Sequence, residues 1–106
     1  MIRVKEGVDI SQCSGEILYA VILINPLFHK YGIDTVLTSG HEDYKHSAKR
    51  SAHYRRDAVD VRSRQVLDPA GMVEDMREVL GLDYVVLFEG NHFHIHWGPV
   101  YEEVKI

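Results

Sequence analysis

Histidine is the residue type that this sequence uses most unusually. Seven of its 106 residues are histidine, and three of them alternate along one segment as His92, His94 and His96. Neutral imidazole is the commonest metal ligand among side chains and also serves as a general acid or base. Isolated histidines are usually solvated or hydrogen-bonded, which is our interpretation of His29 and His41. The alternating histidines, in contrast, indicate a chemical site.

The donor groups needed for a catalytic zinc ion are present in the chain. Such an ion takes three protein ligands from histidine nitrogen or carboxylate oxygen and keeps a fourth position for water. His53 and Asp60 supply two ligands if residues 54–57 turn the chain back. The third should come from the histidine segment, where His94 is preferred and His96 is the alternative on the same face. One zinc ion is therefore the predicted cofactor.

These residues predict the hydrolysis of an amide. Bound zinc lowers the pKa of its water from about 15.7 to about 7 and polarises a carbonyl. A carboxylate must then carry the proton of that water to the leaving amine, and Glu89 is the candidate base, with Glu102 and Glu103 as substitutes. His92 or His46 is expected to hydrogen-bond the oxyanion or to orient the attacked carbonyl.

Strands must hold these side chains in place. Every second residue of 92–97 is apolar, residues 84–88 form a continuous apolar run, and a Gly-Asn pair between them predicts a β-hairpin. Phe93, Ile95 and Trp97 should face the core and the histidines the opposite face. The alternation in residues 58–62 predicts another strand, which directs Asp60 and Arg62 away from the core.

One long helix is expected near the start of the chain. Apolar residues occupy most sides of residues 14–31, as in a largely buried helix. Ser11 or Ser14 is the predicted cap, and Gly32 should end the helix. Because proline lacks a backbone N–H, Pro26 predicts a kink or an early stop.

The remaining elements complete an α+β fold. Residues 33–39 are rich in β-branched side chains and predict a strand, whereas residues 41–56 read as a polar loop. Asp68 followed by Pro69 predicts the start of a second helix, which should end at Gly81. We therefore expect a small, mostly antiparallel sheet that carries the zinc site on one face and packs helices on the other.

Composition limits the possible partners. The 106 residues suit one domain spanning residues 1–106, expected to be monomeric, and the formal charge of −4 argues against nucleic acid or an anionic membrane as partner. The single cysteine, Cys13, excludes an intrachain disulfide and should be buried. The apolar run 17–24 is too short to span a bilayer, and no secretory signal is evident. A basic cluster suited to an anionic polymer lies beside the candidate ligands, at Lys49, Arg50, Arg55 and Arg56.

The candidate residues form a longer pattern that resembles a known family. It comprises His46-Ser47, Ser51-Ala52-His53-Tyr54, Ala58-Val59-Asp60 and His92-Phe93-His94. Over more than half of the chain, from Thr38-Ser39-Gly40 to Pro99, this pattern is similar to a zinc-peptidase superfamily. That superfamily unites D-alanyl-D-alanine carboxypeptidases and dipeptidases, phage L-alanyl-D-glutamate endolysins and the hedgehog signalling domain.

The resemblance implies a role for each matching residue. Zinc ligands would be His53, Asp60 and His94, the base would be Glu89, and Ser51 would contact the substrate through its hydroxyl. The segment from Glu89 to His94 resembles the phage members in particular. The implied function is a phage-type endolysin that cuts peptidoglycan stem peptides in the bacterial cell wall, during lysis or as part of the virion. A D,D-carboxypeptidase or dipeptidase is the enzymatic alternative.

The chain also departs from the family pattern. Arg56 stands where the family has glycine, and His41-Glu42 replaces an arginine that often follows the Ser-Gly pair. Recognition of a substrate carboxylate would then pass to Arg62 or Arg64, and His46 is a further candidate for substrate contact. Hedgehog shows that this scaffold can keep its metal and serve in recognition. A non-catalytic, zinc-bearing wall-binding or virion module is therefore a second interpretation.

Overall fold

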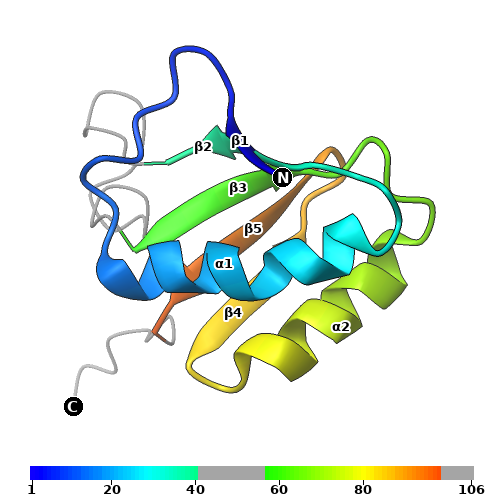
Figure 1. The fold of residues 1–106 in the computed structure, drawn as a ribbon. Helices are drawn as coiled ribbons and strands as arrows, with labels where there is room; N and C mark the ends of the chain where they lie inside the picture. Colours follow the sequence, from blue (N-terminus) through cyan, green and yellow to red (C-terminus); the bar gives the residue numbers. More distant parts are fainter. Residues whose placement is uncertain (41–56, 99–106) are drawn as a thin grey trace.

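In the computed structural model, the described residues 1–40 and 57–98 form five strands and two helices. In chain order these are β1 (Ile2–Val4), α1 (Gly15–His29), β2 (Thr35–Ser39), β3 (Ala58–Arg62), α2 (Pro69–Leu80), β4 (Tyr84–Phe88) and β5 (His92–Trp97). The strands form one sheet in the order β1-β2-β3-β5-β4, and both helices lie against the same face of it (Figure 1). In this layered α+β arrangement, no helix of the described residues covers the other face of β3 and β5.

The sheet is mixed, so the prediction of a mostly antiparallel sheet is corrected. Strands β2, β3, β5 and β4 pair antiparallel in turn, but β1 pairs parallel with β2, with Ile2 opposite Thr35. A parallel neighbour requires a crossover connection, and α1 supplies it. The three residues of β1 are all exposed. Ile2-Arg3-Val4 does alternate, but three residues are fewer than the four to eight from which a strand is predicted.

The predicted hairpin and its turn are confirmed. Strands β4 and β5 pair over their whole length, and the backbone N–H of Glu89 donates to the carbonyl of His92 at 2.9 Å. Gly90 takes a positive φ of 91°, which fits the first position of the two-residue turns that join antiparallel strands. On the outer edge of β4, Arg77 of α2 donates two hydrogen bonds to the carbonyl of Val86, at 2.8 and 3.2 Å. The hairpin is thus anchored to α2.

The first helix begins as predicted but does not stop at its proline. The Ser14 hydroxyl accepts a hydrogen bond from the N–H of Ile17 at 3.3 Å, which caps the helix. Helix α1 then continues through Pro26 to His29, so the expected early stop is wrong. Pro26 lies in the last turn, where its missing N–H removes one bond of the helix. Phe28, fully buried in the same turn, holds this end against the core.

The end of α1 and the start of α2 lie at the predicted residues. After α1, Gly32 takes a φ of 71° and the N–H of Ile33 donates to the Phe28 carbonyl at 3.1 Å, as in a glycine-terminated helix. Helix α2 begins with Pro69 after Asp68, whose carboxylate accepts from the N–H of Gly71 at 3.1 Å. In the described ranges, neither helix has the length and apolar character that crossing a bilayer would require.

The core lies between the sheet and the helices. Val59 and Val61 of β3 and Phe93 and Ile95 of β5 are fully buried there, as the alternation predicted. Phe28 meets Phe93 edge to face, with ring centroids 6.2 Å apart. Trp97 was also expected to face the core, but it is 39% exposed at the end of its strand. Cys13 is buried as predicted, and Met72 and Met76 of α2 are buried as well.

Strand β1 is tied to the sheet by an ion pair that should respond to pH. The Arg3 guanidinium donates to Asp34 at 2.7 Å, and this hydrogen bond, together with the Arg3 charge, holds the pKa of Asp34 below its ordinary value. Because the folded pKa is the lower one, its contribution to stability is present above the unfolded pKa of about 3.9. The contribution is lost as the pH falls through the folded pKa.

We expect Arg3→Ala to raise the pKa of Asp34 toward its ordinary value, because the main group that favours the carboxylate is removed. The measurement is an NMR titration of the Asp34 side-chain carbonyl in both proteins. Lys5→Ala removes a cation from the same segment and serves as the matched control. Identical Asp34 titration curves in the wild type and Arg3→Ala would contradict the assignment.

Candidate functional site

The centre of the candidate site is a cross-strand pair on the face of the sheet opposite the helices. Asp60 of β3 lies directly opposite His94 of β5, and Asp60 Oδ1 is 3.1 Å from His94 Nδ1. The two side chains are only 16% and 14% exposed, respectively. Because Val59 and Val61 fill the core face, the strand must direct Asp60 outward. The pattern of alternation thus produces a partly shielded carboxylate–imidazole pair.

His96 extends this pair into the sheet. Its Nδ1 lies 2.8 Å from His94 Nε2, so His94 contacts Asp60 through one ring nitrogen and His96 through the other. His96 is 3% exposed and lies opposite Ala58, whose small side chain leaves room for the imidazole. Asp60, His94 and His96 therefore form one hydrogen-bonded row. Of the two histidines weighed as the third ligand, His94 is the one that faces Asp60.

Two more predicted residues lie at the turn end of the same face. His92 Nε2 is 3.6 Å from Asp60 Oδ2, and its Nδ1 hydrogen-bonds the side-chain oxygen of Asn91. Glu89 Oε1 lies 3.8 Å from His94 Nδ1 and 3.9 Å from His92 Nε2. Glu89 is 46% exposed, whereas His92 is 28% exposed. The hairpin turn thus brings a solvent-accessible carboxylate to the edge of the Asp60–His94 pair.

The structure brings together Asp60, Glu89, His92 and His94, the described residues that were predicted to bind zinc or to take part in catalysis. Arg62 also belongs to this face, because it pairs with His92 in the register of β3 and β5. Arg64 lies elsewhere, beside α2 in the lining of a separate pocket. Several predicted residues fall outside the described ranges: His46, Ser51 and His53, the basic cluster with Arg56, and Glu102 and Glu103.

Sequence reasoning missed two neighbours of the site. The register of β2 against β3 shifts between Leu37 and Ser39, which places Ser39 opposite Asp60. Such an irregularity inserts or removes a residue, so it cannot be read from simple alternation. Asn91 was interpreted only as a turn residue, yet its side chain contacts His92. A signal for this contact existed, because a residue in a two-residue turn lies close to the first residue of the next strand.

The Asp60–His94 pair fits two ligands of one zinc ion. Donor atoms bonded at about 2.0–2.1 Å to a tetrahedral ion lie about 3.3 Å apart, close to the 3.1 Å between Asp60 Oδ1 and His94 Nδ1. Oxygen and imidazole nitrogen are also donor types that zinc accepts. Within residues 1–40 and 57–98, no group of three histidine, cysteine or carboxylate side chains is arranged to hold a metal. The predicted third ligand, His53, lies outside these ranges.

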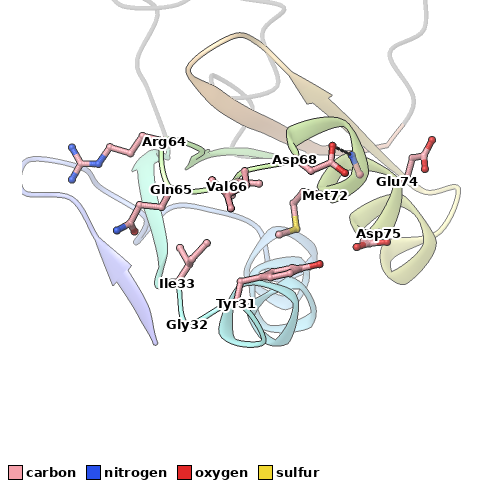
Figure 2. Close-up of a pocket in the computed structure, with 12 residues that line it drawn as sticks. Tyr31, Gly32, Ile33, Arg64, Gln65, Val66, Asp68, Met72, Glu74 and Asp75 are labelled. Carbon is pink, nitrogen blue, oxygen red and sulfur yellow. Dashed lines mark hydrogen bonds between the residues drawn. The ribbon is translucent and has the colours of Figure 1, made fainter.

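A separate pocket of about 770 Å³ opens between the end of α1 and the start of α2 (Figure 2). Tyr31, Ile33 and Met72 provide apolar surface, and Asp68 and Glu74 contribute carboxylates. None of the described residues that line it belongs to the sheet face that carries Asp60, His92, His94 and His96, here called the histidine face. This pocket and the candidate chemistry therefore occupy different parts of the described molecule.

The histidine face combines groups suited to metal binding and proton transfer on two rigid, paired strands. The carboxylates of Asp60 and Glu89 each lie within 4 Å of both His92 and His94, near the turn of the β4–β5 hairpin. Such a convergence of titratable side chains is a recognised feature of catalytic sites.

No family model matches this chain, and neither a curated protein nor a solved structure shows significant similarity to it.

Proposed function

We propose that this protein is a zinc-dependent peptidase that hydrolyses an amide bond in peptidoglycan stem peptides. The observation that carries the proposal is the Asp60–His94 pair, at 3.1 Å and partly shielded, with the Glu89 carboxylate 3.8 Å from the same imidazole nitrogen. Asp60 and His94 would be two of the ligands, and His53 would be the third. The likeness of the motif to phage enzymes favours an L-alanyl-D-glutamate endopeptidase of the endolysin type.

Each described residue has a role in this proposal. When bound, zinc would supply a Lewis acid and a water of lowered pKa. Glu89 reaches the pair from the exposed turn, so it can accept the proton of the attacking water and return it to the leaving amine. His92 Nδ1–H donates to the side-chain oxygen of Asn91, so in its imidazolium form His92 can also donate from Nε2 to the developing oxyanion. Arg62, on the same face, is placed to bind a carboxylate of the substrate.

The choice of peptidoglycan rests on the resemblance of the motif. The stretches around His53, Asp60 and His94 resemble the zinc-peptidase pattern, and the segment from Glu89 to His94 resembles the phage members in particular. A site at a strand face beside a hairpin end suits an extended peptide, because a substrate can lie along the exposed end of β4. The described Leu87, 42% exposed and opposite His94, offers an apolar contact there.

The direct test is digestion of purified peptidoglycan by the protein before and after metal removal. We expect new peptide ends with zinc present, none after chelation, and recovery on adding one equivalent of zinc. Mass spectrometry of the products distinguishes the bonds: new D-glutamyl amines identify the endopeptidase, and free D-alanine identifies the carboxypeptidase or dipeptidase. Zinc-dependent binding to the cell wall without release of a product would instead support the non-catalytic wall-binding or virion module. Arg56, which stands where the family has glycine, is the departure that leaves room for this second interpretation.

A further inference from the structure

We propose that His96 is a positioning residue that selects the His94 tautomer required for metal binding. The proposal rests on the function assigned above and adds a residue to that site. In it, His94 Nε2–H donates to His96 Nδ1 when zinc is bound, which leaves the lone pair of His94 Nδ1 directed toward the side of Asp60. The juxtaposition of His94 Nε2 and His96 Nδ1 at 2.8 Å is the observation from which it starts.

The contact is a directed hydrogen bond between ring edges. The ring centroids lie 5.0 Å apart with the planes inclined by 58°, while the two nitrogens are only 2.8 Å apart. The rings therefore meet at their nitrogens and do not stack. A hydrogen bond between two imidazoles needs one donor and one acceptor, so the tautomers of His94 and His96 are linked.

The link connects His96 to metal binding through the other side of His94. Neutral imidazole carries a proton on one ring nitrogen only. If His94 Nε2 carries it, then Nδ1 presents a lone pair 3.1 Å from Asp60 Oδ1, and both atoms can share a cation. If His94 Nδ1 carries the proton, then that N–H donates to Asp60 and the nitrogen has no lone pair with which to bind the metal. A hydrogen-bond acceptor at the position of His96 Nδ1 therefore favours the first form, in which His94 Nδ1 can bind the metal.

The environment of His96 explains why this position holds a histidine. It is 3% exposed in the middle of the sheet, between Ala58 of β3 and Val85 of β4. An apolar side chain would satisfy such a place more simply, because a buried imidazole is unfavourable unless it is hydrogen-bonded. The partner on the second nitrogen of a metal-binding histidine is known to raise metal affinity, typically by 10–100-fold. The structure assigns that role to His96.

Three substitutions separate this role from simple packing. Asn places its amide oxygen near the Nδ1 position of histidine, Gln places its amide farther out, and Leu keeps the bulk of Asn without a polar group. We expect the zinc dissociation constant, measured by competition with a chromophoric chelator, to rise by about 10–100-fold in His96→Leu and His96→Gln. His96→Asn should stay within about threefold of the wild type because it can still accept from His94 Nε2–H. Far-ultraviolet circular dichroism and thermal melts identify variants that fail to fold.

The wild-type protein provides a test that needs no variant. Long-range ¹H–¹⁵N NMR spectra of the zinc-loaded protein should show His94 protonated at Nε2 and His96 carrying no proton at Nδ1. Unchanged zinc affinity in a folded His96→Leu, or a His94 protonated at Nδ1 in the loaded protein, would overturn the inference and leave the peptidase proposal standing. Absence of zinc binding by the wild type would overturn both, and so the two failures are distinguishable.

Discussion

Replacing Glu89 by glutamine is expected to slow cleavage of peptidoglycan peptides by about 10²–10⁴-fold, the usual contribution of a general acid or base. The amide retains the size of the side chain at the hairpin turn but cannot accept the proton of the attacking water. In the wild type, the Glu89 side chain is 46% exposed and its carboxylate lies 3.8 Å from His94 Nδ1, so the carboxylate is accessible to water and close to the proposed ligands. Zinc affinity should remain within a few-fold of the wild type, because Glu89 is not assigned as a ligand.

The measurement is kcat on a defined stem peptide, with the amount of bound zinc determined on the same samples. Glu78→Gln is the matched control, because Glu78 is an exposed glutamate of α2 that lies away from the histidine face. Cleavage by Glu89→Gln at the wild-type rate would remove the role of Glu89 and direct attention to Glu102 and Glu103. Loss of zinc together with activity would instead identify Glu89 as part of the metal-binding set.

Local patterns were sufficient to predict most elements of the described fold. The alternation in residues 58–62 and 92–97 predicted both strands and the faces of Asp60 and His94, because burial of one face forces every second side chain outward. The cap at Ser14, the start at Pro69 and the turn at Gly90 depend on neighbouring residues alone, so they too were predictable. The faces alone left open which histidine lies opposite Asp60, and the register of β3 and β5 shows that it is His94.

Features that depend on distant parts of the chain were not predictable in this way. Strand β1 owes its place to the crossover through α1 and to the bond between Arg3 and Asp34, and its own residues are exposed. The position of Ser39 opposite Asp60 depends on a shift in register, which leaves no mark in the pattern of apolar residues. The contact between His96 Nδ1 and His94 Nε2 depends on side-chain conformation, whereas the spacing of the histidines identifies only a shared face.

Asparagine in place of Asp60 should abolish cleavage and weaken zinc binding by more than the roughly 100-fold loss that accompanies removal of a residue contacting a ligand. The neutral amide can still hydrogen-bond His94, so the sheet should keep its register while the charge that attracts the cation is lost. The effect should also appear in stability. A ligand present at 100 times its dissociation constant stabilises the folded state by about 2.7 kcal/mol, which should vanish in Asp60→Asn.

The decisive measurement for Asp60 is therefore the melting temperature with and without zinc, alongside direct titration of the metal. The wild type should melt higher when zinc is added, whereas Asp60→Asn should melt at one temperature in both conditions. Asp83→Asn is the matched control, because Asp83 is an exposed aspartate that precedes β4. An equal zinc-dependent shift in Asp60→Asn would mean that the 3.1 Å contact with His94 is only a hydrogen bond of the sheet surface. The site would then lack the carboxylate ligand on which the hydrolytic proposal depends.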